Sequence, residues 1–309
     1  SRQDCIPEKN TPMKKVTIRD YYDLTPSLGN AQGDIWADLP THGLLGAKTI
    51  PGIVITPACD LANCKVETIT YLPIVPVTRF FSLTAALPEL RRAVDGQLNA
   101  ASLNGLLQWP DGFTPPDNDL LAATQDLISD AKKSGRLGAN QIDSARRAEA
   151  GLRILRTICD ESAGQMDASD IRHLFGDKEW LSLRTRIVRN AFRPDLYFLP
   201  ADGQPPEWSG ISVHSLVLFR YSLTAPVEIF EAAQNIEMLD WRNCCEGIAC
   251  VSPIATAFAN VKPMKRISLR PDFLSDLLTR YVGIYIRLGS PDFTKETVSQ
   301  YCEELNCSK

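Results

Sequence analysis

The hydrophobic pattern of residues 33–77 predicts short β-strands. The runs GDIWADL, PGIVITPA and ETITYLPIVPV are rich in β-branched and aromatic residues, and Pro or Gly separates them. Short runs of this kind between turn residues are typical of strands. We therefore expect the chain to begin with a group of strands joined by tight turns.

From about residue 83 to 191 the pattern becomes helical. LPELRRAVDGQLNAASLNGLL carries leucines at helical spacing, and the Pro-rich QWPDGFTPPDND separates it from LLAATQDLISDAKK. The periodicity continues in NQIDSARRAEAGLRILRTICDES. DASDIRHLF then opens with Asp167 and Asp170, an arrangement typical of a helix start. Apolar residues three or four positions apart indicate amphipathic helices.

Strand character returns in the last third of the chain, in RPDLYFLPA, VHSLVLFRYSLTAPVEIF and GIACVSPIA. The last clear element is a helix in RPDFLSDLLTRYVGIYIRLGSP, which Pro271 starts and Gly289 and Pro291 end. We therefore expect an α+β protein whose strand-rich body is split by a helical insertion, with a C-terminal helix. The expected divisions are residues 1–85 for the first strands, 86–192 for the insertion and 193–309 for the remainder.

The composition is that of an ordinary soluble globular protein. Of 309 residues, 44% are hydrophobic and 23% are charged. The net charge of −4 gives no overall basic field toward nucleic acid or anionic membranes, although a local basic face is compatible with it. The N-terminal SRQDCIPEKN lacks the apolar core of a signal peptide, and the apolar stretch 273–289 is interrupted by Asp276, Arg280 and Arg287. We expect a cytoplasmic protein that does not enter a membrane.

The nine cysteines indicate reduced thiols rather than a disulfide framework, because their number is odd and the chain is long. No CxxC pair is present, and the spacings Cys59-x4-Cys64 and Cys245-x4-Cys250 match no common zinc motif. We therefore predict neither a metal nor a cofactor. The alternative is a zinc-stabilised module that uses Cys59, Cys64 and the cysteines at 244, 245 and 250, and elemental analysis would decide.

One stretch resembles a known family. Gly33-Asp34-Ile35-Trp36 is followed by the turn Pro40-Thr41-His42-Gly43, by seven residues, and by the run from Pro51 to Pro57. This order is similar to the opening of the PemK/MazF-like toxins, and YLPIVPVTRF resembles their next strand, which ends in a Thr near the active site. That family consists of small SH3-like barrels that act as endoribonucleases. The resemblance covers residues 33–78 and implies an SH3-like β-barrel interrupted by the helical insertion.

The resemblance also places candidate catalytic residues. Thr78 matches the family's threonine, but the family's catalytic arginine falls on Ile50, which can neither take up a proton nor stabilise charge on a phosphate. Arg79 or Lys48 is expected to take the cationic role. If the chain is an active, metal-independent endoribonuclease, we expect its site at Thr78, Arg79 and Asp60.

Asp60 and its neighbour Cys59 each have a simpler interpretation. An Asp that follows a strand commonly caps its own turn. Cys59 would need a base to act as a nucleophile, and His42 is the nearest candidate, whereas an inert thiol is the common case. The sequence leaves these alternatives open.

Basic residues offer candidate contacts to phosphate. Arg186, Arg189 and Arg193 recur at i, i+3 and i+7 on the predicted helix EWLSLRTRIVRNAF, and Lys48 and Lys65 flank the run PGIVITP. These are the candidate nucleic-acid-binding residues. A solvated face is the alternative for the arginines, because charges opposite a core stripe are usual in amphipathic helices. A further basic cluster, in NVKPMKRISLR, contains Lys262, Lys265, Arg266 and Arg270.

Several standard catalytic motifs are missing from the sequence. It has no GxxxxGK[ST], GxGxxG, HExxH or GxSxG, so P-loop, dinucleotide, zincin and α/β-hydrolase chemistry have no support. The resemblance instead implies an RNA-handling or nucleic-acid-associated module of a bacterial or phage toxin–antitoxin or defence-type system, with RNA as partner. The alternative is a non-catalytic scaffold for a protein partner encoded nearby. The oligomeric state is not predicted.

Overall fold

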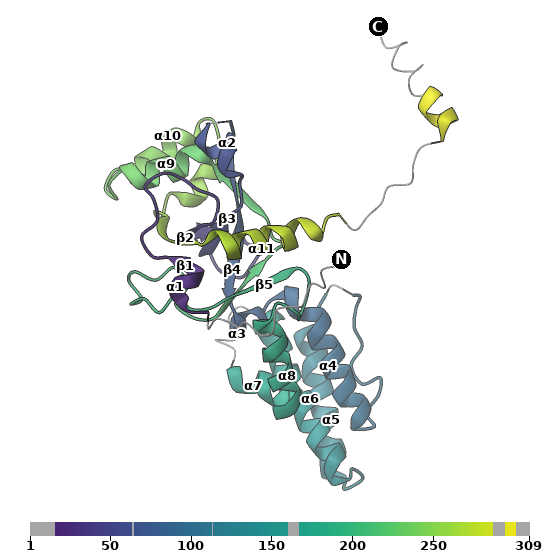
Figure 1. The fold of residues 1–309 in the computed structure, drawn as a ribbon. Helices are drawn as coiled ribbons and strands as arrows, with labels where there is room; N and C mark the ends of the chain where they lie inside the picture. The colour runs from purple at the N-terminus through teal and green to yellow at the C-terminus, as the bar shows by residue number, and fades with distance from the viewer. Residues whose placement is uncertain (1–15, 64, 113, 160–166, 287–293, 301–309) are drawn as a thin grey trace, which may run out of the picture.

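The computed structural model describes residues 16–63, 65–112, 114–159, 167–286 and 294–300. Within this part of the chain, a single antiparallel sheet of eight strands has the order β1-β8-β2-β3-β4-β6-β5, and β7 pairs with β4 (Figure 1). The strands are β1 (Tyr22–Asp23), β2 (Asp34–Pro40), β3 (Thr49–Val54), β4 (Thr68–Pro76), β5 (Leu196–Leu199), β6 (Ser215–Leu218), β7 (Leu223–Pro226) and β8 (Met264–Leu269).

The sheet is open, so the predicted SH3-like barrel is wrong. Strand β4 pairs with β3 along one edge and with two strands along the other: residues 68–71 pair with β7, and residues 74–76 pair with β6. The path through β6 then ends at β5, while the opposite path ends at β1. Among the described residues no pairing joins β1 to β5, so the sheet does not close on itself. Because β7 and β6 pair with different parts of β4, the sheet branches at this strand and does not close into a barrel.

The Gly33–Trp36 segment, which opens the resemblance, has a structural role. Asp34 is fully buried, and its carboxylate accepts hydrogen bonds from Ser268 Oγ at 2.5 Å and from the Ala31 N–H at 2.8 Å. Lys265 Nζ lies 3.1 Å from the same carboxylate and completes an ion pair. A buried carboxylate requires such partners, and these bonds connect β2 to β8.

Helices fill the chain between β4 and β5, within the expected insertion range 86–192 or just before it. They are α3 (Val77–Phe80), the 3₁₀ helix η1 (Thr84–Ala86), α4 (Leu87–Ala100), α5 (Asn118–Lys133), α6 (Ala139–Cys159), α7 (Ala168–Phe175) and α8 (Asp177–Val188). The helices α4 to α8 lie together beside one end of the sheet (Figure 1). Asp117 caps α5 by accepting from the Leu120 N–H, and Asp167 caps α7 by accepting from the Ser169 N–H.

An apolar core joins these helices to the sheet. It contains Leu155 of α6 and Val94 of α4 together with Val75 of β4 and Ile50 of β3, and Phe80 lies between the two groups along the chain. Because one core includes side chains from both parts, burial of apolar area holds the helices against the sheet.

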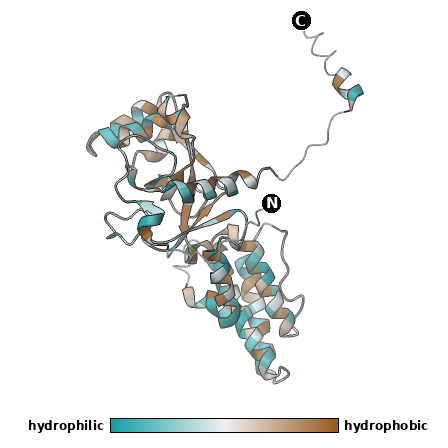
Figure 2. Cartoon of the chain, in the orientation of Figure 1, coloured by the Kyte–Doolittle hydropathy of each residue, from teal (hydrophilic) through white to brown (hydrophobic). Residues whose placement is uncertain are grey.

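Helices also cover both faces of the sheet. The remaining helices are α1 (Ile18–Tyr21), α2 (Ala58–Ala62), α9 (Val227–Asn235), α10 (Trp241–Ala249), the 3₁₀ helix η2 (Pro253–Phe258) and α11 (Pro271–Gly283). Ile35 belongs to a core with Leu277 of α11, whereas its neighbour Trp36 packs edge-to-face on Phe230 of α9, with ring centroids 4.9 Å apart. This alternation follows the period of two in a strand. Hydrophobic colouring accordingly follows the strands, and hydrophilic colouring marks the outer sides of the helices (Figure 2).

In the C-terminal third, one predicted strand is wrong, and the predicted end of the last helix lies outside the residues that the structure describes. GIACVSPIA, predicted as a strand, forms the end of α10 and the start of η2. Cys245, Ile248 and Ala249 contact the core at helical spacing, and Pro253 begins η2. Gly289 and Pro291, expected to end the last helix, lie outside the described residues. None of the helices in the described part is both long and apolar enough to cross a membrane.

Candidate functional site

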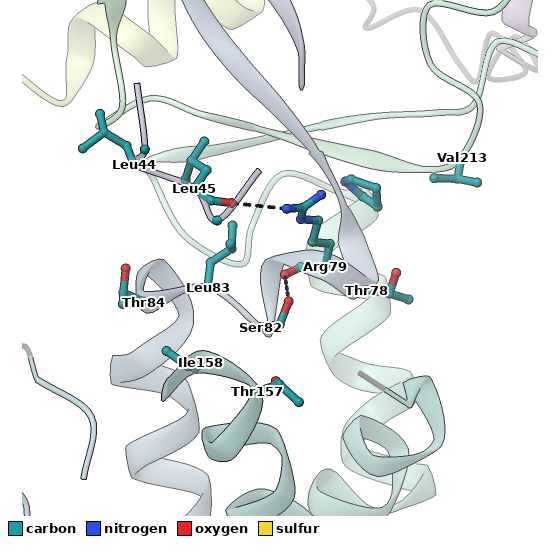
Figure 3. A pocket seen from close by; sticks show the side chains of 13 residues that line it. Leu44, Leu45, Thr78, Arg79, Ser82, Leu83, Thr84, Thr157, Ile158 and Val213 are labelled. Atoms are coloured by element: carbon teal, nitrogen blue, oxygen red, sulfur yellow. Dashed lines mark hydrogen bonds between the residues drawn. The ribbon is translucent and has the colours of Figure 1, made fainter. Parts of the chain in front are cut away.

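A cavity of about 880 Å³, here called the junction pocket, lies where the sheet meets the helices (Figure 3). Its wall is formed by the β2–β3 loop, by α3 and the segment after it, by the C-terminal end of α6, and by the loop before β6. The lining residues are Gly43, Leu44, Leu45, Gly46, Pro76, Thr78, Arg79, Ser82, Leu83, Thr84, Thr157, Ile158 and Val213.

Thr78 and Arg79 reach this pocket because α3 begins directly after β4. Phe80 is fully buried and anchors α3 in the core, while Thr78 is exposed and Arg79 is half-buried. The Arg79 side chain points toward the β2–β3 loop, and its Nη2 donates a hydrogen bond to the Leu45 carbonyl oxygen at 3.3 Å (Figure 3). A guanidinium has five N–H donors, and the described residues supply Arg79 with no other acceptor. Most of its donors therefore remain for a ligand.

The β2–β3 loop is folded back so that its backbone faces the pocket. The buried Thr41 holds the base of the loop: its N–H donates to the Lys48 carbonyl at 3.1 Å, and its hydroxyl donates to the Ala47 carbonyl. Gly43 and Gly46 have φ values of 82° and 59°, a region that glycine adopts without steric cost. The glycines thus allow the tight path that places the loop opposite Arg79.

The junction pocket is electrostatically suited to an anion. Among its lining residues Arg79 carries the sole charge, and none is a carboxylate. Hydroxyl groups of Thr78, Ser82, Thr84 and Thr157 also line it, although Ser82 Oγ already donates to the Arg79 carbonyl at 2.8 Å. A guanidinium in a partly enclosed site interacts more strongly with an anion than one in open water. The remaining lining is largely apolar.

Asp60, the third candidate catalytic residue, lies away from this pocket. It is in α2, which follows β3, whereas the pocket loop precedes β3. The strand has six residues, which corresponds to about 20 Å at roughly 3.3 Å per residue. The Asp60 carboxylate accepts a hydrogen bond from Cys59 Sγ at 3.5 Å, and its backbone carbonyl accepts from the Lys65 N–H. The structure therefore brings Thr78 and Arg79 together and leaves Asp60 at the opposite end of β3.

Ile50, at the position of the family's catalytic arginine, is buried. It is 5% exposed and belongs to the core that joins sheet and helices. An arginine there would place its charge among apolar side chains, at a high desolvation cost. Ile50 thus contributes to the packing of the core and supplies no catalytic group.

The candidate nucleic-acid-binding residues have different environments. Lys48 and Lys65 are exposed, as is Arg189. Arg186 lies over the Phe192 ring and donates to the Phe192 carbonyl at 3.2 Å. Arg193 is instead committed within the protein: it donates to the Ala85 carbonyl and pairs with Glu89 and Asp195.

The second basic cluster is also used by the fold. Lys262 donates to the Ile236 carbonyl, Lys265 pairs with Asp34, Arg266 donates to the Glu207 carbonyl, and Arg270 donates to the Tyr22 carbonyl. These contacts join β8 and the residues on either side of it to neighbouring segments. We therefore do not include this cluster in the site.

The cysteines form no site in the described part of the chain. Cys59 follows β3 and His42 precedes it, so the thiol and the imidazole lie at opposite ends of that strand. Cys245 is buried, and burial raises the pKa of its thiol to about 11. Among the described residues, no three His, Cys, Asp or Glu side chains are grouped closely enough to hold a metal. Cys64, part of the zinc alternative, lies outside the described residues.

The predicted catalytic residues Thr78 and Arg79 both line the junction pocket, but the sequence did not point to the rest of its wall. Thr157, Ile158 and Val213 come from segments far along the chain, and no local motif marks them. In the β2–β3 loop the sequence pattern marked Gly43 as a turn residue but gave no signal for Gly46.

Comparison of the chain with protein-family models, with curated proteins and with solved structures found no match in any of the three. The relation to the PemK/MazF-like family stays a prediction from residues 33–78.

Proposed function

We propose that the protein binds single-stranded RNA and that the junction pocket holds a phosphate group of the strand. The observation that carries the proposal is the Arg79 guanidinium, which faces a cavity without a lining carboxylate. Arginine and hydroxyl side chains are the usual partners of nucleic-acid phosphates. Thr78 and Thr84 supply hydroxyl groups beside Arg79.

The apolar rim of the pocket suits the remainder of a nucleotide. Leu44 and Val213 are about half exposed, at 54% and 48%, and both line the cavity. Binding sites of this kind combine apolar walls with a few placed polar groups. A cavity of about 880 Å³ admits a nucleotide but not a double helix, which favours a single strand.

The geometry supports binding rather than cleavage. Cleavage of RNA through its 2′-hydroxyl needs a general base within hydrogen-bond reach. No carboxylate or imidazole lines the described pocket, Asp60 lies at the far end of β3, and the exposed His42 is not part of the wall. The proposed role of Arg79 is therefore to hold the phosphate.

The experiment is a titration of fluorescently labelled single-stranded RNA, followed by anisotropy, with Arg79→Ala as the test variant. We expect binding at least about tenfold weaker than in the wild type, because a charge-assisted hydrogen bond contributes about 1.5–3 kcal/mol. The slope of the logarithm of the affinity against the logarithm of the salt concentration should also decrease in magnitude by about 1, the value for one phosphate contact. Arg92→Ala is the matched control, since Arg92 is an exposed arginine of α4 outside the pocket.

Equal affinities of Arg79→Ala and Arg92→Ala would contradict the assignment of the pocket, and absence of binding by the wild type would contradict RNA as the ligand. Incubation of end-labelled RNA tests the second part of the proposal. We expect the RNA to stay intact. Cleavage by the wild type that Arg79→Ala abolishes would contradict a role of the pocket in binding alone.

A further inference from the structure

A second cavity, here called the arginine cleft, lies in the helical insertion. It has a volume of about 570 Å³ and lies between α6, α7 and the start of α8. Its lining residues are Asp143, Arg146, Arg147, Glu149, Arg153, Ser169, Arg172, His173, Gly176 and Asp177. Arginine is the commonest residue in this wall, in contrast to the single charge of the junction pocket.

Helical periodicity gathers these arginines. Arg146 and Arg153 are seven residues apart on α6, which places them on the same face two turns from each other. Arg172 projects from α7 on the other side of the cleft. Gly176 leaves space for Arg147, since a Cβ built at Gly176 would overlap its guanidinium.

The charges in the cleft are incompletely paired. Arg147 pairs with Asp143 at 2.8 Å, Arg153 binds Asp170 through two nitrogens, and Arg172 pairs with Asp177. Glu149 is neutralised from behind by Lys132. Arg146 is exposed and makes no ion pair or hydrogen bond with any residue that the structure describes.

The pairs at the mouth of the cleft are of the kind that exchange partners easily. The side chains of Arg172 and Asp177 are 64% and 77% exposed, and those of Arg147 and Asp143 are 36% and 59% exposed. Exposed ion pairs contribute little to stability, so a ligand with more charge than a carboxylate can replace them at small cost.

We infer that the arginine cleft binds a ligand with a chain of phosphate groups, such as inorganic tripolyphosphate or the polyphosphate of a nucleotide. The planar guanidinium matches phosphate oxygens with two parallel hydrogen bonds. Arg146 of α6 and Arg172 of α7 would contact successive phosphates, while Arg153 stays bound to Asp170. The His173 imidazole of α7 also lines the cleft and can supply a further donor. This site is separate from the junction pocket and does not depend on the RNA proposal.

The test is calorimetric titration of the full chain with inorganic tripolyphosphate, with sulfate at equal ionic strength as the reference. We expect tripolyphosphate to bind more tightly than sulfate. Arg146→Ala and Arg172→Ala should each weaken it about tenfold, whereas Arg92→Ala should leave it unchanged. Because Arg146 has no partner among the described residues, its removal should not affect folding, which circular dichroism would check.

A variant with the opposite expected effect makes the test sharper. Asp177→Asn removes the carboxylate that competes for Arg172 and should strengthen tripolyphosphate binding about twofold or more. Tripolyphosphate binding no tighter than that of sulfate would overturn the inference. Wild-type affinity in both Arg146→Ala and Arg172→Ala would also overturn it.

Discussion

Arg79 and Arg193 are both half-buried at the junction of sheet and helices, but they meet different partners. Arg79 faces a cavity and makes one long hydrogen bond to a carbonyl. Arg193 lies between Glu89 of α4, at 3.0 Å, and Asp195 before β5, at 2.6 Å. Burial alone would raise the pKa of Asp195, but hydrogen bonds from Arg193 and its positive charge bring that pKa below its ordinary value. Arg79 is thus available for a ligand, and Arg193 stabilises the fold.

Arg193→Ala should lower the free energy of unfolding by about 2–4 kcal/mol, because Glu89 loses its cation and the buried Asp195 keeps only the exposed Arg220. Arg193→Lys should lose less, since it keeps the charge without the planar fork. Urea unfolding near pH 7 measures both, and Arg92→Ala should change stability by less than about 0.5 kcal/mol.

The pH dependence of the same variant gives an independent check. The pKa of Asp195 is lower in the folded state than its ordinary value of 3.8, so its stabilising contribution is complete above that value and is lost as the pH falls below it. Arg193→Ala should therefore lose less stability than the wild type between about pH 5 and pH 3. Parallel loss of stability in the two proteins would contradict this role of Arg193.

At the scale of elements, the helices α4, α6 and α7 pack closely enough that one glycine decides their approach. A Cβ built at Gly151 of α6 would overlap Val94 of α4 and lie 3.0 Å from Leu174 of α7. Gly96 of α4 is instead exposed, and a Cβ there would meet nothing within 4 Å. Packing therefore requires a glycine at position 151 but not at position 96.

Gly151→Ala should destabilise the protein by about 1–3 kcal/mol through overpacking. Gly96→Ala should stabilise it by about 0.5–1 kcal/mol, because alanine favours the helix and meets no obstacle. Thermal unfolding of the two variants measures both effects. A decrease in stability for Gly96→Ala, or none for Gly151→Ala, would contradict the packing described for these helices.

The local sequence pattern was sufficient to predict most helices and strands, but not whether the sheet closes into a barrel. The short β-branched and aromatic run GDIWADL corresponds to β2, and the helical spacing of apolar residues after residue 86 corresponds to the helices α4 to α8. GIACVSPIA was misread as a strand because a short apolar run does not separate a strand from a buried helix. The barrel was misjudged because closure depends on which strands pair with β4, a long-range property that no local run encodes.

At the scale of the whole molecule, the proposed binding site exists because sheet and helices meet. The junction pocket takes its wall from the β2–β3 loop, α3, the end of α6 and the loop before β6. Arg79 could be named from the sequence because it adjoins Thr78, whereas Thr157 and Val213 could not, since only the tertiary arrangement brings them to the same cavity. The core that contains Ile50 and Leu155 holds these walls in place.

Photochemical cross-linking of 4-thiouridine-labelled single-stranded RNA to the full chain, followed by mass spectrometric mapping of the attached peptides, tests the binding site most directly. The account predicts cross-links in segments 43–46, 76–84 and 157–158 and at Val213, all of which line the junction pocket, and it predicts that Arg79→Ala reduces them. Cross-links confined to other segments, with none in the pocket wall, would contradict it.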